Sequence, residues 1–181
     1  MLGSTQRLEV ADSDAVHGSG LEVVQRRTGG GAVLAGPGEH LWVDVWLPAD
    51  DPLRADDVTR SFTWLGRACQ QMLDSLGVET GMHEGGAAFG RFGRLVCFAG
   101  MGAGELEWAG RKVVGLAQRR NRFGSRFQVA VLLRWDPDEL LGLLALPPGD
   151  AADARRTLPN VAAPVEAPEA ELLGALRAAL P

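Results

Sequence analysis

The sequence predicts an α+β fold, with a mixed, mainly antiparallel sheet flanked by helices. Three features of the 181-residue chain indicate it. Segments with strand character follow one another without the regular βαβ alternation that builds a parallel sheet. The dipeptide Ala109-Gly110 separates two of these segments at the spacing of a β-hairpin. A longer segment in the first half of the chain repeats its apolar residues with the period of a helix.

The first quarter of the chain predicts strands on both sides of a glycine loop. An apolar run at 21–25 precedes residues 26–33, RRTGGGAV, in which three glycines lead into a second strand. Residues 40–47 alternate with the period of two that is typical of a strand. Because both faces of this segment carry apolar side chains, we expect it to lie in the centre of the sheet.

The middle of the chain predicts a helix followed by glycine-rich connections. Apolar residues have helical spacing over 56–76, with acidic residues at the start and Gly77 at the end. Residues 81–93 are rich in glycine and predict a mobile loop. Residues 94–99 predict a strand, and a second glycine-rich loop follows at 100–104.

The rest of the chain predicts the hairpin, a further strand and two helices. These elements are hairpin strands at 105–108 and 112–117, a strand at 127–133, a helix at 138–146 and a last helix at 169–180. Residues 151–168 are rich in Ala and Pro and predict a linker or an extended wrap. We therefore expect a main domain over 1–150 and an appendage of linker and helix over 151–181.

Composition restricts the compartment and the partners that we expect. The chain is 46% hydrophobic with a formal charge of −5, so neither nucleic acid nor an anionic membrane is expected as its main partner. No apolar stretch approaches the length of a membrane span. Cys69 and Cys97 do not have the spacing of a metal site, and the first residues do not resemble a signal peptide. We therefore expect a cytoplasmic protein without a metal cluster.

Lys112 is the first candidate for chemistry. It is the only lysine beside seventeen arginines, and it lies in residues 110–115, GRKVVG. Ammonium is a compact point charge, whereas guanidinium is a wide planar fork, so a position that keeps lysine in this composition indicates a need for a small cation at short range. The alternative is a surface lysine beside a hairpin turn.

The glycine loop is the second candidate. Gly29, Gly30 and Gly31 allow backbone amides to approach a ligand closely, and Arg26 and Arg27 beside them offer bidentate donors to phosphate or carboxylate. The loop has neither the Walker pattern nor the dinucleotide-binding pattern. The alternative is a tight turn between strands.

Together these segments resemble a known pair of motifs. Residues 26–33, followed about eighty residues later by 110–118, GRKVVGLAQ, are similar to the signature of the biotin and lipoate protein ligase superfamily, with the lipoate–protein ligase branch the closer match. Residues 2–6, LGSTQ, resemble that family's short strand ending in Gly-x-x-Gln. The resemblance extends to about Leu146, and it implies a biotin/lipoate ligase-like catalytic domain with a mainly antiparallel sheet.

The ligase branch implies a two-step reaction that attaches lipoate or octanoate to a carrier lysine. ATP and Mg²⁺ activate the acid as an acyl-adenylate, and Lys112 corresponds to the lysine that stabilises the developing charge. Arg27, Gly29, Gly30 and Gly31 would line the acyl and phosphate groups; the remaining residues carried over with this pocket are Arg26, Ala32, Gly115 and Gln118. The partners implied are lipoyl domains of 2-oxoacid dehydrogenases or the glycine cleavage protein.

A second branch is the octanoyltransferases, which take octanoate from acyl carrier protein through a cysteine thioester. Cys97-Phe98 and residues 105–112 resemble the stretch around that nucleophile. Cys97 would then be the nucleophile, with a nearby cation such as Lys112 favouring its thiolate form. The alternative is a buried strand cysteine. From the sequence we prefer ligation to transfer, because the unbroken run of three glycines matches the ligases.

Two departures from the family pattern leave a non-catalytic module open. Residues 34–36, LAG, stand where the family has a histidine after the glycine loop, and a second histidine, expected before a later strand, is replaced around 128–130. The chain also begins where the family has already formed a strand and a helix, so we expect a shortened N-terminus. A non-catalytic acyl-binding or carrier-binding module, or one subunit of a split ligase, are further alternatives.

A basic run follows the lysine motif. Its members are Arg119, Arg120, Arg122 and Arg126. Lipoyl domains and acyl carrier protein are usually acidic, so this run predicts a docking surface for them, and the alternative is a solvated hairpin end.

Overall fold

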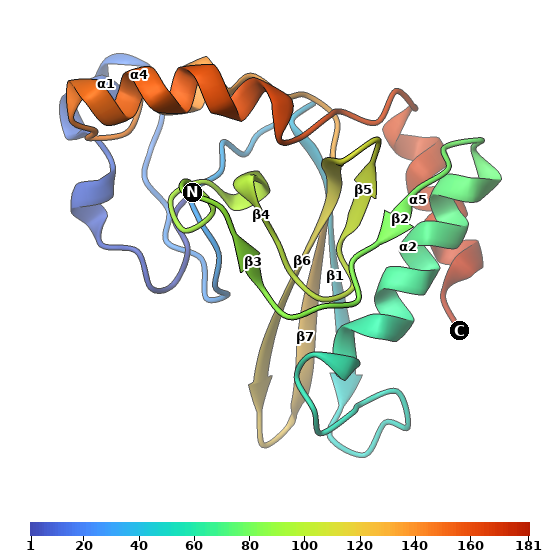
Figure 1. Cartoon of the computed structure of the whole chain (residues 1–181). Helices are drawn as coiled ribbons and strands as arrows, with labels where there is room; N and C mark the ends of the chain where they lie inside the picture. The colour runs from blue at the N-terminus through green and yellow to red at the C-terminus, as the bar shows by residue number, and fades with distance from the viewer.

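The computed structural model describes all 181 residues and has a five-stranded antiparallel sheet at its centre (Figure 1). The strand order is β1-β7-β6-β5-β2, and β3 and β4 form a separate pair. The strands are β1 His40–Pro48, β2 Gly81–Met82, β3 Ala88–Phe89, β4 Gly100–Met101, β5 Leu106–Trp108, β6 Arg111–Asn121 and β7 Gly124–Leu132. The helices are α1 Ser13–Gly18, α2 Thr63–Ser75, α3 Pro137–Leu141, α4 Pro148–Thr157 and α5 Glu169–Ala179. The predicted fold class is confirmed.

Helices α2 and α5 cover one face of the sheet, as Figure 1 shows, and the main core lies between them and the strands. The apolar side of α2 is fully buried at Leu65, Met72 and Leu73, which explains its helical periodicity in the sequence. The helix begins later than predicted, because Asp57 instead accepts from Arg60 N and starts a 3₁₀ turn at Arg60–Phe62. Gly77, with φ 78°, follows its end as predicted.

Two hairpins organise the sheet. In the first, Ala109 and Gly110 have φ of 49° and 73° and connect β5 with β6, as the sequence predicts. In the second, β6 and β7 pair from Val114 with Val131 to Asn121 with Gly124. Strand β1 pairs only with β7, so its predicted central position is wrong: β1 lies at the edge of the sheet.

Three predicted strands are absent. Residues 21–25 form no strand, and only Gln25 makes an isolated bridge, with Leu2. The strand predicted after the glycine loop is reduced to an isolated bridge at Ala32. Residues 94–99 form turns and a 3₁₀ helix, Cys97–Ala99, because the chain must bend after its single bridge between Val96 and Ala32. The glycine-rich segment 81–93 contains β2 and β3.

The segment expected to be a linker is largely structured. Helix α4 occupies its beginning, with Pro148 in the first turn, so the expected boundary near residue 150 lies inside a helix. After α4 the chain is an extended wrap tied to the sheet, since Ala163 N donates to Lys112 O and Lys112 N donates to Val161 O. Helix α5 then contributes Leu172 and Leu176 to the main core. Helix α3 is shorter than the predicted 138–146, and the short helix α1 was not predicted.

Candidate active site

A cavity of about 240 Å³ lies on the face of the sheet opposite α2 and α5, between β6, the glycine loop and the 97–105 segment. Its lining residues are Arg26, Gly29, Gly30, Trp42, Phe89, Gly93, Cys97, Gly100, Met101, Gly102, Glu105, Lys112, Gly115, Leu116, Ala117, Gln118, Gln128 and Ala130. Seven of the ten residues singled out from the sequence are in this set. The other three, Arg27, Gly31 and Ala32, do not line the cavity.

The glycine loop is held against the segment that carries Cys97. Ala32 N donates to Leu95 O over 2.7 Å, and Cys97 N donates to Ala32 O over 2.9 Å. A Cβ at Gly31 would lie 2.6 Å from the Val96 backbone, so Gly31 serves this close approach rather than a ligand. These contacts fix the loop directly beside Cys97.

The other side of the loop is anchored to the sheet and to the N-terminal segment. Thr28 Oγ1 donates to Gln128 Oε1 over 2.6 Å in the buried interior. A Cβ at Gly3 would lie 1.9 Å from Gly30 O, so only glycine fits at position 3. Gln6 donates to the carbonyl of Leu95 over 3.0 Å, which accounts structurally for the Gly-x-x-Gln spacing. The loop is therefore braced on both sides.

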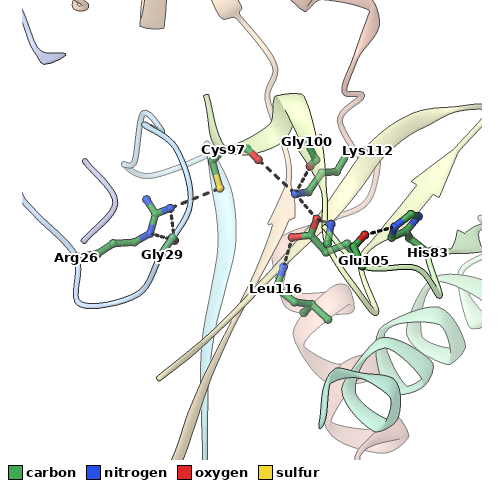
Figure 2. Close-up of polar contacts among 10 residues, drawn as sticks. Arg26, Gly29, His83, Cys97, Gly100, Glu105, Lys112 and Leu116 are labelled. Carbon is green, nitrogen blue, oxygen red and sulfur yellow. Dashed lines mark hydrogen bonds and ion pairs between the residues drawn. The ribbon is translucent and has the colours of Figure 1, made fainter. Parts of the chain in front are cut away.

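Arg26 points from this loop toward Cys97 (Figure 2). Its side chain is buried, its Nη2 donates to Gly29 O over 2.8 Å, and the same nitrogen lies 3.7 Å from Cys97 Sγ. Its Nη1 is buried without a hydrogen-bond partner. No carboxylate forms an ion pair with Arg26. A positive charge that is not neutralised by the protein therefore lies beside the Cys97 sulfur.

Lys112 reaches the cavity because β6 contains a bulge. Leu106 pairs with Val114 and Glu107 pairs with Lys112, so one step along β5 corresponds to two along β6. The extra residue, Val113, directs Lys112 to the opposite face of the sheet from Val114. Val114 enters the main core, whereas Lys112 lines the cavity with 3% of its side chain exposed. The alternative of a surface lysine is therefore wrong.

The ammonium of Lys112 is fully used by the protein. Its Nζ lies 2.5 Å from Glu105 Oε2 and donates to Gly100 O over 2.8 Å and to Cys97 O over 3.3 Å (Figure 2). An ammonium has three N–H donors, and here three acceptors take them. Glu105 also accepts from the backbone amides of Gly102 and Leu116. This buried pair fixes the 97–105 segment to β6.

The cation that faces the thiol differs from the one expected. The sequence suggested Lys112 as the partner of Cys97, but the Lys112 ammonium contacts the carbonyl of Cys97, and the guanidinium of Arg26 contacts its sulfur. Arg27, which the family resemblance assigned to the pocket, is exposed. Cys97 itself is half-buried in a 3₁₀ helix, so the alternative of a buried strand cysteine is also wrong.

Glu105 and Gln128 are the polar lining residues that sequence reasoning missed. A buried lysine requires a counter-charge, so the signal for Glu105 was present once Lys112 was expected inside. Gln128 had no such signal, since its contact with Thr28 spans 100 residues of chain. Gln128 also donates to Asp44 Oδ1 over 3.0 Å. Burial alone would raise the pKa of Asp44, but hydrogen bonds from Arg126 and Gln128 lower it.

Cys69 and His40 are titratable residues that do not line the cavity. Burial raises the pKa of the Cys69 thiol to about 12, so this cysteine stays protonated and inert. His40 stacks on Phe98, and burial lowers its pKa to about 4. Both ring nitrogens of His40 are buried without partners. No three His, Cys, Asp or Glu side chains come together as a metal site.

The basic run lies along the far half of the β6–β7 hairpin. Arg126 forms a bidentate ion pair with Asp44, and Arg120 donates to the carbonyl of Asp56. Arg119 and Arg122 make no ion pair and stay exposed at the surface. None of the chain's helices combines the length and the apolar character needed to cross a bilayer.

Known proteins match this chain in both sequence and fold. Residues 1–168 match the model of the lipoyl protein ligase A/B catalytic domain. The chain belongs to that family. Two octanoyltransferases LipM of the family, from Moorella thermoacetica and Lysinibacillus sphaericus, are each 32% identical, over 153 and 156 residues. These alignments cover 81% and 82% of this chain but 54% and 55% of the relatives, so the chain spans about half their length.

Solved lipoate–protein ligases share the fold. A bi-partite lipoate protein ligase from Thermoplasma acidophilum, described with its E2 lipoyl domain, superposes with a TM-score of 0.78 at 22% identity, over 98% of this chain and 64% of that one. A lipoate-protein ligase A bound with ATP gives a TM-score of 0.69 at 22% identity, over 98% of this chain and 65% of that one. The predicted fold and family are confirmed.

Proposed function

We propose that this chain is an acyltransferase that moves an octanoyl group from a carrier thioester to a lysine of a lipoyl domain through Cys97. The observation that carries the proposal is the contact of the Cys97 sulfur with an unneutralised guanidinium at the cavity surface. The two LipM relatives favour the same chemistry. Ligation, preferred from the sequence, becomes the second candidate.

The cavity supplies what the transfer requires. Apolar side chains, among them Trp42, Phe89, Met101 and Ala130, form a wall for an alkyl chain. The Cys97 thiolate attacks the thioester carbonyl of the donor, a new C–S bond forms, and the carrier thiolate leaves and takes up a proton. The amine of the target lysine then attacks the Cys97 thioester, an amide forms, the amine gives up a proton, and the Cys97 thiolate is released.

ATP-dependent ligation is the second candidate because the glycine loop fits a phosphate. The backbone N–H groups of Gly29 and Gly30 have no acceptor within the chain, and the Arg26 guanidinium lines the cavity beside them. These groups would hold a phosphate of ATP, which supplies the activated acyl-adenylate when bound. Glu105 is the only carboxylate in the cavity lining and is already engaged, so the residues present do not provide a direct Mg²⁺ ligand.

Two donors separate the candidates. The chain is incubated with a lipoyl domain and either octanoyl carrier protein or octanoate with ATP and Mg²⁺, and acylation of the lipoyl domain is followed by mass. We expect acylation from octanoyl carrier protein, abolished in Cys97→Ala and retained in Cys69→Ala. Acylation only from octanoate and ATP, unaffected by Cys97→Ala, would establish ligation. Carrier binding without acylation from either donor would indicate a non-catalytic module. Activity that appears only when a second polypeptide is added would indicate a split ligase.

A further inference from the structure

We propose that Arg26 is a catalytic cation of the Cys97 reaction, holding the thiolate through Nη2 and holding the unpaired N–H groups of Gly29 and Gly30 beside the oxyanion that forms on the acyl group. This inference rests on the proposed function. It concerns which positive charge acts on the reacting atoms, and four observations support it.

The first observation is the difference in free donors. All three N–H bonds of the Lys112 ammonium are directed to Glu105, Gly100 and Cys97 O. A substrate can reach this ammonium only by displacing one of those acceptors. The Arg26 side chain is more than nine-tenths buried, and its Nη1 is covered by the protein without a partner. Its Nη2 reaches the Cys97 sulfur, so this nitrogen can act on the reacting atoms without displacing a carboxylate.

The second observation is the charge balance. The Lys112 charge is neutralised by Glu105, at 2.5 Å, so the pair as a whole carries no net charge. No acid pairs with Arg26, and its contacts are a neutral carbonyl, Gly29 O, and a sulfur, Cys97 Sγ. A guanidinium interacts more favourably with a thiolate than with a thiol, and Arg26 is the cation in contact with the sulfur.

The third observation is the backbone beside the sulfur. Gly30 has φ 103°, and the position of its missing Cβ is 3.6 Å from Cys97 Sγ and 2.5 Å from Arg26 Nη2. The absent side chain leaves the sulfur, the guanidinium and the loop backbone in direct contact. An acyl carbon bonded to Sγ would therefore lie next to Arg26 and to the free N–H groups of Gly29 and Gly30.

The fourth observation is that the position of Arg26 is fixed by the fold. Arg26 N donates to Leu2 O over 2.9 Å, and its Nε and Nη2 both donate to Gly29 O. The side chain is therefore oriented before any substrate binds, which lowers the cost of stabilising charge in the transition state.

The test separates the thiolate from the oxyanion. Alkylation of Cys97 by iodoacetamide needs only the thiolate, whereas octanoyl transfer needs the thiolate and a donor to the oxyanion. Both rates are measured at pH 7 and pH 9.5 for the unchanged chain, Arg26→Gln, Arg26→Lys and Arg27→Gln, with peptide mapping to identify Cys97. Arg27→Gln is the matched control, since Arg27 is the exposed neighbour outside the cavity.

We expect alkylation of Arg26→Gln at pH 7 to fall about tenfold and to recover at pH 9.5. Octanoyl transfer by the same variant stays about 100-fold lower at both pH values, because the N–H donors of Gly29 and Gly30 lose the side chain that holds them beside the oxyanion. Arg26→Lys keeps part of the alkylation rate, and Arg27→Gln keeps all of it. Alkylation of Arg26→Gln at the unchanged rate at pH 7 would overturn the thiolate role. Transfer that recovers in parallel with alkylation at pH 9.5 would overturn the oxyanion role.

A measurement on the unchanged chain covers the case in which Arg26→Gln does not fold. The ratio of Cys97 alkylation rates at pH 9.5 and pH 7 is compared between the folded chain and the chain unfolded in urea. A smaller ratio in the folded chain supports the proposal, and an equal or larger ratio overturns it. The alkylation assays use no acyl donor, so failure of octanoyl transfer in the unchanged chain refutes the proposed function while leaving the Arg26–Cys97 contact separately tested.

Discussion

The two ends of the cavity differ in how the protein balances their positive charge. At the Lys112 end a buried carboxylate and two carbonyls use every donor of the ammonium. At the Arg26 end a buried guanidinium has no acid, one nitrogen without a partner and a sulfur as its neighbour. A charge that an acid neutralises acts less on its surroundings than a charge without an acid. The comparison supports the proposal that Arg26 acts on the reacting atoms, and it gives Lys112 a part in holding the site together.

The largest expected effect is a difference in stability between the two ends. Glu105→Gln leaves the Lys112 ammonium buried without its counter-charge, and we expect it to lower the free energy of unfolding by about 3–5 kcal/mol. Arg26→Gln removes a charge that has no acidic partner, so we expect a loss of about 1 kcal/mol or less. Urea unfolding of both variants measures this difference. Equal losses would contradict the assignment of Lys112 to structure and of Arg26 to chemistry.

Lowering the pH is expected to destabilise the protein first at the Lys112 end of the cavity. His40 stacks on Phe98 with ring centroids 5.4 Å apart, and the Lys112 ammonium lies over the same ring. Because burial lowers the pKa of His40 from 6.5 to about 4, the neutral ring is favoured in the folded chain. The neutral His40 ring therefore makes its full contribution to the free energy of unfolding above pH 6.5. This contribution is lost as the pH falls from 6.5 toward 4, and the loss is about 3 kcal/mol at most.

The control for this acid effect is His40→Phe, which keeps an aromatic ring beside Phe98 and removes the titrating group. We expect the free energy of unfolding of this variant to change less between pH 7 and pH 4 than that of the unchanged chain. An identical pH dependence in the two chains would show that other groups cause the loss.

Much of this architecture, but only part of the site, could be predicted from the sequence. The periodicity of α2 and α5 and the turn at Ala109-Gly110 identified helices and a hairpin correctly, because local pattern determines them. Lys112 stood out as the single lysine. The need for an acid beside a buried Lys112 could have been inferred, but that the acid is Glu105 depends on the bulge at Val113, which leaves no mark in composition.

The remaining errors also have physical causes. Arg26 and Arg27 are identical neighbours in the sequence, and which one enters the cavity depends on the backbone of the glycine loop. Residues 94–99 read as a strand because they are apolar, yet a single bridge at Val96 is all they form. Helix α4 was predicted as a linker since it buries little apolar surface, although Pro148 with Asp150 in the first turn is compatible with a helix start.

Glycines at the two ends provide a smaller test of the comparison. Gly30→Ala places a Cβ on a backbone with φ 103° and 2.5 Å from Arg26 Nη2, so we expect a loss of about 1–3 kcal/mol together with reduced reactivity of Cys97. At Gly115 the nearest atoms, those of Lys112 and Glu105, are 3.5 to 3.7 Å from the added Cβ, an ordinary contact. The free energy of unfolding of Gly115→Ala should therefore lie within about 1 kcal/mol of that of the unchanged chain. Similar losses for both variants, measured by thermal unfolding, would remove this distinction.

The smallest expected effect concerns carrier docking at the surface. Arg119 and Arg122 are exposed and lack acidic partners, so they are available to an acidic carrier domain. The double variant Arg119→Glu, Arg122→Glu should raise the KM for the carrier several-fold, with kcat unchanged and a weaker dependence on salt. Arg7→Glu, at a highly exposed position away from the hairpin, is the control. An unchanged KM in the double variant would leave the basic run as a solvated hairpin end.

The central claim, that Cys97 carries the acyl group, is tested most directly by trapping the intermediate. The chain is mixed with octanoyl carrier protein in the absence of a lipoyl domain, quenched in acid and analysed by intact mass and peptide mapping. The account predicts one octanoyl group on the peptide that contains Cys97, removed by hydroxylamine and then transferable to an added lipoyl domain. No adduct on Cys97, in a preparation that still acylates the lipoyl domain from octanoate and ATP, would contradict it.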